Sequence, residues 1–198
     1  MAVACDPAFN FVYEANIRYL HHLGEVTYFS PLADTSLPDA GFVYLPGGYP
    51  ELYLAALSAN RQMLQSIRRY VESGGKLLAE CGGMMYLCDE IRDKNGYVYP
   101  MAGVLHQSAT MENMKLRLGY RTLLYNETRL KGHEFHYSRL VEQQNPLPSC
   151  AVAYTAKGVE TDTPLYHYKN VWAGYTHLYW ADPVGNEWFT KFVIDGNI

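Results

Sequence analysis

Apolar residues in the first half of the chain follow two spacings, short continuous runs and runs with helical periodicity. The continuous runs predict strands at Ala2–Cys5, Glu25–Ser30, Phe42–Leu45 and Lys76–Glu80. The periodic runs between them predict helices at Tyr13–Leu23, Glu51–Leu57 and Arg61–Ser73. This alternation is typical of an α/β protein in which a largely parallel sheet carries helices on both faces. Functional groups are then expected at the carboxyl ends of the strands.

The pattern changes in the second half, where short strand-like segments predominate and we expect mixed or antiparallel pairing. These strands are predicted at Arg121–Tyr125, Glu134–Arg139, Ala151–Tyr154, Leu165–Tyr168 and Val171–His177. A last helix is predicted at Asn186–Ile194, and the two prolines of Gln143–Ser149 indicate a surface turn. No repeat or linker interrupts the chain, so residues 1–198 are predicted to form one domain.

Composition narrows the class of protein. The chain has 198 residues, 48% of them hydrophobic and 18% charged, with a net charge of -4, which is typical of a folded soluble protein and argues against a nucleic-acid partner. No apolar stretch is long enough to span a bilayer. The four cysteines lack metal-ligand spacing and no basic leader precedes them, so free thiols in the cytoplasm are expected. The 18 tyrosines are attributed to half-buried sheet positions.

One cysteine lies where a strand is predicted to turn directly into a helix. Cys81 follows the predicted strand Lys76–Glu80, and Ala79 and Gly83 flank it at a distance of two residues on either side. Such small residues are what a nucleophile elbow requires, because this tight turn leaves no room for larger neighbours. The start of a helix also favours a thiolate. A buried structural cysteine is the alternative, and the local string alone does not decide between the two.

A thiol nucleophile needs a proton carrier and hydrogen-bond donors for the developing oxyanion. Of the seven histidines, His177 ends a strand-like run as Cys81 does, so the fold can bring the two together. The glycines of Pro46–Pro50 allow close backbone approach, and the N–H of Gly48 can pair with that of Gly82 to form a two-donor hole. Taken alone, however, Pro-Gly-Gly is most often a simple turn.

The histidine pair His133 and His136 raises the question of a metal site. Residues three apart on a strand point to opposite faces, so these two would not share one ion, and no metal is predicted. A substrate-facing role for Lys131–Ser138 and a purely structural role at the core edge both stay open.

Together these residues resemble the class I glutamine amidotransferases, whose fold is flavodoxin-like. More narrowly, the chain is similar to the glutaminase domain of the cobyrinic acid a,c-diamide synthase family of corrinoid biosynthesis. The resemblance covers nearly the whole chain and lies in strings shared with that family. They are Asp6–Asn16, Tyr28–Asp34, Leu45–Leu52, Glu80–Leu87, Gly132–Ser138 and Tyr175–Leu178.

The resemblance implies specific roles. Cys81 would attack the side-chain amide of L-glutamine to form a thioester, His177 would relay the proton, and Gly48 and Gly82 would bind the oxyanion. Apart from the resemblance, Tyr49 and Glu51 are candidates for substrate contact because they lie close to Gly48 in the sequence, and Glu134 or His136 is a candidate for contact with the polar end of the ligand. Many class I members carry a glutamate two residues after the histidine, where this chain has Tyr179, so what orients the imidazole is open.

The resemblance also implies a partner. Family enzymes carry an N-terminal synthetase domain that uses ATP and Mg²⁺ to activate corrinoid carboxylates, and this chain has no G-x-x-x-x-G-K-[ST] string. The chain itself is expected to need no cofactor. We expect it to be the carboxyl-terminal domain of a longer enzyme or, alternatively, a separate glutaminase subunit. The oligomeric state stays open, a homodimer included.

The expected activity is therefore glutamine hydrolysis, which supplies ammonia for amidation of the a and c carboxylates of cobyrinic acid in cobalamin biosynthesis. Other acceptors are alternatives, namely hydrogenobyrinic acid, nickel-sirohydrochlorin, cobyric acid precursors or a peptidoglycan lipid intermediate. A catalytically silent docking domain and a cysteine peptidase or chaperone-type hydrolase are the remaining alternatives.

Overall fold

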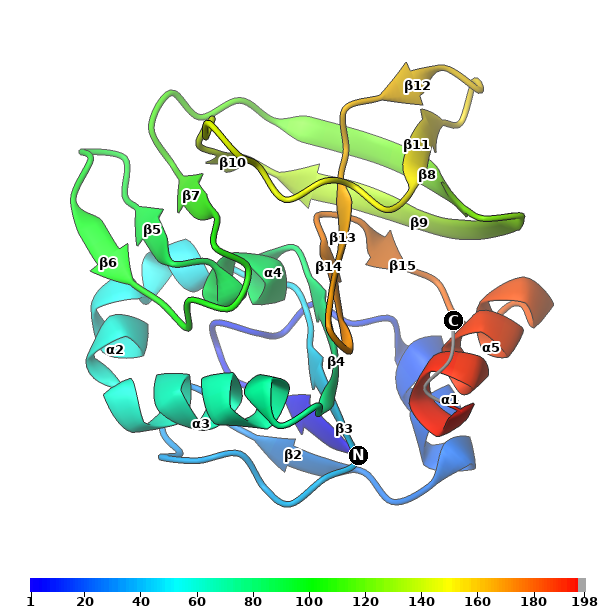
Figure 1. Cartoon of the computed structure of the whole chain (residues 1–198), viewed down its shortest axis with the longest axis horizontal. Coiled ribbons are helices and arrows are strands. Elements are labelled where there is room, and N and C mark those ends of the chain that lie inside the picture. The colour runs from blue at the N-terminus through cyan, green and yellow to red at the C-terminus, as the bar shows by residue number, and fades with distance from the viewer. Residues whose placement is uncertain (196–198) are drawn as a thin grey trace.

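The computed structural model describes residues 1–195 and contains three β-sheets, the largest of which lies between two groups of helices (Figure 1). That sheet has the strand order β13-β14-β4-β3-β1-β2. Its strands are β1 Ala2–Ala4, β2 Thr27–Phe29, β3 Phe42–Leu45, β4 Lys76–Glu80, β13 Leu165–Tyr168 and β14 Val171–Gly174. Neighbouring strands run parallel, except that β13 is antiparallel to β14. The predicted, largely parallel sheet is confirmed.

Helices cover both faces of this sheet, which explains why its inner strands β1, β3, β4 and β14 are buried without alternation. The helices are α1 Glu14–Leu23, the 3₁₀ turn Pro50–Leu52, α2 Leu54–Ala59, α3 Arg61–Glu72, α4 Gly82–Leu87, α5 Pro183–Thr190 and the π-helical turn Lys191–Asp195. Val43 and Leu77 belong to the core on the α2–α3–α4 face. Their strand neighbours Tyr44 and Leu78 belong to a second core on the α1–α5 face.

The other two sheets are formed mainly by the second half of the chain. One is antiparallel throughout, in the order β12-β11-β8-β9-β15, and the other has the order β10-β7-β5-β6. The first comprises β8 Arg117–Tyr125, β9 Thr128–His136, β11 Val152–Thr155, β12 Glu160–Thr161 and β15 His177–Leu178. The second comprises β5 Glu90–Arg92, β6 Val98–Pro100, β7 Ser108–Thr110 and β10 Arg139–Leu140. The predicted antiparallel or mixed pairing of the second half is confirmed.

Two predicted strands are each divided in the structure. Val171–His177 is not one strand, because β14 ends at Gly174 and β15 begins at His177, so that the chain leaves the parallel sheet and joins β9. Glu134–Arg139 is divided between the end of β9 at His136 and β10. The ring of His136 donates through Nδ1 to the carbonyl oxygen of Ser138 at 2.9 Å, and this local bond closes the turn between the two strands.

Two helix boundaries also differ from the prediction. The last helix begins at Pro183 instead of Asn186, because Asp182 caps it by accepting a hydrogen bond from the N–H of Gly185 at 2.8 Å. Glu51–Leu57 is divided into the 3₁₀ turn and α2. The short strands β5, β6, β7 and β12 were not predicted, since runs of two or three residues carry little periodicity.

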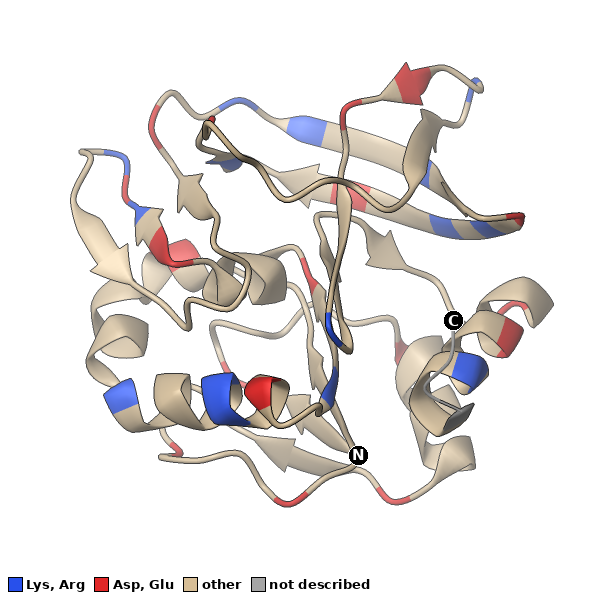
Figure 2. Ribbon diagram, viewed as in Figure 1, with Lys and Arg blue, Asp and Glu red and all other residues tan. Residues whose placement is uncertain are grey.

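Positive and negative residues occur together on several elements of the chain. Figure 2 shows blue and red residues interspersed along α3, α5 and the β8–β9 hairpin. Within residues 1–195, no helix is both long and apolar enough to cross a membrane.

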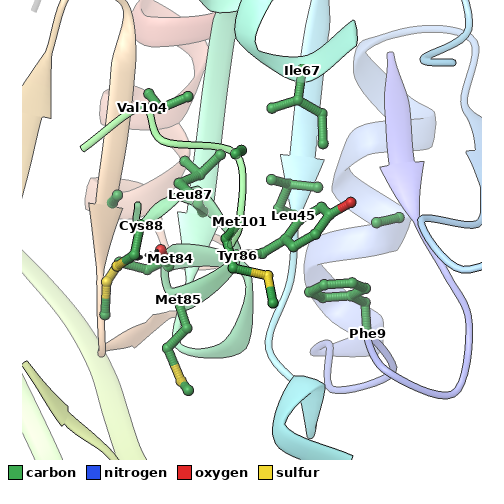
Figure 3. Close-up of a cluster of buried hydrophobic side chains, with 14 of the residues drawn as sticks. Phe9, Leu45, Ile67, Met84, Met85, Tyr86, Leu87, Cys88, Met101 and Val104 are labelled. Carbon is green, nitrogen blue, oxygen red and sulfur yellow. Dashed lines mark hydrogen bonds between the residues drawn. The ribbon is translucent and has the colours of Figure 1, made fainter. Parts of the chain in front are cut away.

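The helix after Cys81 is embedded in the larger core. Figure 3 shows Met84, Tyr86 and Leu87 of α4 among apolar side chains from β3 and α3. Tyr86 also packs on Phe9, with ring centroids 5.2 Å apart. Every residue of α4 is buried, so the helix gives the neighbouring cysteine a rigid support.

Candidate active site

Cys81 occupies a sharp turn between β4 and α4, which confirms the predicted strand–turn–helix arrangement. Its backbone has φ 49° and ψ -105°, a conformation that side-chain-bearing residues rarely adopt. Its N–H donates to the carbonyl oxygen of Gly174 at 2.7 Å. A Cβ on Gly83 would lie 2.1 Å from the carbonyl oxygen of Leu45, so only glycine fits on this side of the turn.

Cys81 and His177 meet in one cavity of about 340 Å³, although they belong to different sheets. The cavity lies at the carboxyl end of β4, where the parallel sheet approaches the antiparallel one. Its lining residues are Phe11, Gly48, Tyr49, Cys81, Leu118, His133, Phe135 and His177.

A buried carboxyl group joins the two strands that carry the cysteine and the histidine. Glu80, directly before Cys81, accepts hydrogen bonds from the N–H of Leu178 at 3.0 Å and from the hydroxyl of Tyr44 at 2.6 Å. Burial raises the pKa of Glu80 to about 8, against the lowering effect of these bonds. Glu80 therefore fixes the end of β4 to β15 next to His177.

The imidazole of His177 is almost completely buried and neutral. Burial and the neighbouring imidazoles of His133 and His136 lower the pKa of His177 to about 3. Gly47 lies against the ring, since a Cβ there would come within 2.1 Å of Cε1 of His177. At neutral pH the imidazole is therefore unprotonated, the form that a general base requires, and its lowered pKa makes it a weak base in this buried position.

The thiol of Cys81 is protonated at neutral pH in this state. Burial and the nearby Glu51 carboxyl raise its pKa to about 12, while the N–H of Gly82 acts in the opposite direction. The thiol lies 3.9 Å from the carbonyl oxygen of Phe135. The arrangement therefore places a neutral thiol and a neutral imidazole in the same cavity.

The two glycines expected to form the oxyanion hole lie next to each other. A Cβ on Gly82 would be 3.2 Å from the backbone nitrogen of Gly48. The loop that carries Gly48 is held in place from both sides. Tyr49 donates its N–H to Ala8 at 3.0 Å, and Gly47 accepts from the N–H of Phe11 at 3.0 Å.

A second, small void of about 10 Å³ adjoins the cavity at Cys81 and is lined by three of the expected substrate-contacting residues. Its lining residues are Gly48, Tyr49, Glu51, Cys81, Met85, Phe135, His136, Tyr137 and Ser138. Burial raises the pKa of Glu51. Nε2 of His136 is buried and has no hydrogen-bond partner within residues 1–195. Tyr49, Glu51 and His136 thus lie together beside the thiol.

Glu134, the fourth expected contact, lies elsewhere. Its side chain is fully buried and its Oε2 lies 2.7 Å from Nη2 of Arg121. It lines neither the cavity nor the void. The structure therefore gives Glu134 a position in the packing of the β8–β9 hairpin.

Several residues at the site were missed by sequence reasoning. Phe11 and Phe135 line the cavity, and Tyr13 lies directly behind it, where its hydroxyl is 2.5 Å from Nδ1 of His133. Phe11 and Tyr13 fall in the string Asp6–Asn16, which was noted only for its family resemblance. For His133 the sequence raises only the question of a metal ligand and a place in the polar segment Lys131–Ser138.

His133 and His136 contact different groups, as their spacing on a strand predicts. His133 stacks on His177 with centroids 5.0 Å apart, whereas His136 stacks on Tyr175 at 3.8 Å. In the part of the chain that the structure describes, no three His, Cys, Asp or Glu side chains are grouped so as to hold a metal ion.

Comparisons with known proteins agree with this geometry. The sequence profile of the CobB/CobQ-like glutamine amidotransferase domain matches residues 1–184. Hydrogenobyrinate a,c-diamide synthase of Pseudomonas aeruginosa is 40% identical over 185 residues, and cobyrinate a,c-diamide synthase of Fusobacterium nucleatum is 39% identical over 188. Each match covers 90% of this chain but 41% of the relative, so the chain spans about two-fifths of their length.

Solved structures share the fold at low sequence identity. A glutamine amidotransferase crystal structure superimposes with a TM-score of 0.61 and 17% identity, covering 97% of this chain and 98% of the other. PurLQS from Thermotoga maritima gives a TM-score of 0.60 at 17% identity, covering 98% of this chain and 94% of the other. These likenesses establish a class I glutamine amidotransferase fold.

Proposed function

The chain belongs to the CobB/CobQ-like glutamine amidotransferase family, and on that basis we propose that it hydrolyses L-glutamine with Cys81 as nucleophile and His177 as general base and acid. The observation that carries the proposal is their common cavity, in which the cysteine occupies a strained elbow and the histidine is held neutral. The adjacent amides of Gly48 and Gly82 supply donors for an oxyanion.

The reaction follows from these positions. His177 takes the thiol proton as the sulfur of Cys81 attacks the side-chain carbonyl carbon of glutamine, and the amides of Gly48 and Gly82 bind the oxyanion. The tetrahedral intermediate collapses when His177 gives the proton to the departing nitrogen, which leaves ammonia and a thioester. Water then attacks the thioester carbon with His177 taking its proton, and glutamate leaves as the thiol is restored.

We propose that the small void beside Cys81 receives the α-substituents of glutamine. Glu51 is partly buried there, and no cation pairs with it within residues 1–195. A carboxylate in such a position suits the α-ammonium group of glutamine. The tyrosine ring of Tyr49 and the unpaired Nε2 of His136 would lie beside the bound molecule. At about 10 Å³, the void must open before glutamine enters.

We propose further that the ammonia passes to a synthetase domain or subunit, which amidates the a and c carboxylates of cobyrinic or hydrogenobyrinic acid in cobalamin biosynthesis. The names of the relatives and their greater length support this proposal. ATP and Mg²⁺ would act in that synthetase. An exposed apolar rim at the cavity mouth suits a partner surface, since Leu118 is 61% exposed, Tyr120 76% and Phe135 37%.

The test of the hydrolysis is the Cys81→Ser variant in the complete natural protein. We expect glutamine-dependent ammonia release to fall by more than about 1,000-fold, because a serine hydroxyl is a far weaker nucleophile beside a neutral imidazole. An electrophilic glutamine analogue should modify wild-type Cys81, as located by peptide mass mapping, and free glutamine should prevent the reaction.

Cys5→Ser is the matched control, because Cys5 is an exposed cysteine outside the cavity. This variant should release ammonia at the wild-type rate. Undiminished release by Cys81→Ser, or an adduct on another cysteine, would contradict the assignment. The acceptor is tested separately, by mass analysis of cobyrinic and hydrogenobyrinic acid incubated with the complete protein, glutamine, ATP and Mg²⁺.

A further inference from the structure

No carboxyl group within residues 1–195 hydrogen-bonds the ring of His177. The residue two positions further along is Tyr179, and Nδ1 of His177 is buried without a hydrogen-bond partner in the described part of the chain. A catalytic imidazole must nevertheless keep one orientation, because a small misplacement of the base costs a large part of the rate. Because no described residue hydrogen-bonds Nδ1, we look to the packing around the ring for what holds it.

Packing encloses the ring of His177 on three sides. Phe11 meets it edge-on with centroids 4.5 Å apart, and His133 stacks on it at 5.0 Å with 21° between the planes. The backbone of Gly47 lies against the third side. Of the two neighbouring rings, that of His133 is nearly parallel to the ring of His177 and that of Phe11 is not.

The backbone sets the stacking of the two rings. His133 and His177 are direct partners in the antiparallel pair β9–β15, so their side chains leave the same face of the sheet. A Cβ on Gly132 would lie 2.2 Å from the carbonyl oxygen of His177, and this close packing leaves the two strands little room to shift.

Tyr13 holds His133 in turn. Its hydroxyl lies 2.5 Å from Nδ1 of His133, and its ring packs edge-on against Tyr179 at 5.4 Å. Burial raises the pKa of Tyr13 to about 12 and lowers that of His133, so both groups are neutral near pH 7. A phenol is the better donor and an imidazole nitrogen the better acceptor, so Tyr13 donates and His133 carries its proton on Nε2.

We propose that Tyr13 and His133 are positioning residues that orient His177 in place of an acid, Tyr13 by fixing the ring of His133 and His133 by stacking on the ring of His177. The inference rests on the proposed function, because it concerns the same reaction. Neither Tyr13 nor His133 contacts the reacting atoms in this proposal. A neutral His133 also lets His177 carry a positive charge during the reaction, whereas a protonated His133 would repel that charge.

The proposal predicts a pH effect that a purely structural role would not produce. The titratable groups around His133 come from every element packed against it and are Tyr13, Tyr120, Cys81, Glu134 and His177. Only Tyr13 among them hydrogen-bonds the ring in the described structure. Loss of its donated hydrogen bond removes a stabilisation of neutral His133, so its pKa rises and the acid limb of the rate profile moves to higher pH.

The experiment measures kcat and KM for glutamine hydrolysis from pH 5.5 to 9 in the complete natural protein. For Tyr13→Phe we expect kcat to fall by about 10-fold with KM within about twofold, and the acid limb to move upward. The matched control is Tyr179→Phe, which removes a phenol oxygen from the ring that packs on Tyr13 and should match the wild type.

A second pair of variants tests the stacking itself. His133→Phe keeps a flat ring that can stack on His177, so it should retain more activity than His133→Ala. Because the new ring has no titrating nitrogen, the part of the acid limb of the kcat–pH profile that depends on His133 should disappear. Equal losses in these two variants, or a wild-type kcat and pH profile in Tyr13→Phe, would overturn the inference. If the wild-type protein hydrolyses no glutamine and Cys81 resists the glutamine analogue, the proposed function fails and the inference fails with it.

Discussion

Cys81 and His177 come from two halves of the molecule that hold their residues by different means. The parallel sheet fixes Cys81 through the backbone, with a strained φ of 49° and a glycine pressed against the carbonyl oxygen of Leu45. His177 is held by side chains instead, the ring of His133 from the antiparallel sheet and the ring of Phe11 from the loop after β1, and no described residue hydrogen-bonds its Nδ1. Backbone contacts cannot yield without loss of structure, whereas side chains can rotate. A methyl group added beside Cys81 should therefore lower the stability of the fold, whereas one added beside His177 should mainly slow the reaction.

The largest effect is expected on the cysteine side. Gly83→Ala places a methyl group 2.1 Å from the carbonyl oxygen of Leu45, and neither backbone can move away within the packed core. We expect the free energy of unfolding to fall by about 3 kcal/mol or more, as measured by urea denaturation. Gly41→Ala is the control and should leave stability nearly unchanged, since a Cβ there meets nothing within 4 Å. A Gly83→Ala protein of wild-type stability would show that the elbow is less rigid than described.

The second prediction concerns Glu80, which joins the two halves. Its pKa is raised to about 8 from an ordinary value of 4.5, so the folded chain binds this proton more tightly than the unfolded chain. The resulting stabilisation is fully present below about pH 4.5 and is lost as the pH rises towards 8. The maximum slope is about 1.4 kcal/mol per pH unit, and we expect a loss of roughly 2 kcal/mol between pH 6 and 8.

Glu80→Gln isolates this contribution, because glutamine keeps the shape of the side chain but does not titrate. Denaturation curves at pH 6, 7 and 8 should show a flatter pH dependence in the variant than in the wild type. Identical pH dependence in both proteins would mean that Glu80 ionises normally in the folded state.

The smallest expected effect lies on the histidine side. Gly47→Ala places a methyl group 2.1 Å from Cε1 of His177, and here a side chain can turn away. We expect kcat for glutamine hydrolysis to fall by about 10-fold, equivalent to about 1.4 kcal/mol, with a change in unfolding free energy below about 1 kcal/mol. Two results together would contradict the comparison. The unfolding free energy of Gly47→Ala would fall as far as that of Gly83→Ala, and the folded fraction of Gly47→Ala would keep the wild-type kcat.

The sequence predicts the cysteine side more completely than the histidine side, for a physical reason. Strand, turn, nucleophile and helix of the elbow are contiguous, so spacing and small residues alone indicate the position of Cys81. The surroundings of His177 depend instead on pairing between distant segments. Tyr13 and His133 are 120 positions apart, and their contact exists only because β15 leaves the parallel sheet after Gly174 and pairs with β9. Local patterns contain no information on that register, which is why Val171–His177 was predicted as one strand.

The raised pKa of Cys81 has a consequence for the chemical durability of the protein. Burial raises the pKa of the Cys81 thiol to about 12, so little thiolate is present at pH 7, and it is the thiolate that attacks peroxides and ordinary alkylating reagents. The resting protein should therefore survive oxidants that convert accessible low-pKa cysteines to sulfenic acids. Its exposed Cys5 should react with a general thiol reagent before Cys81 does. Burial of Cys81 thus protects its sulfur from the redox conditions of the surroundings.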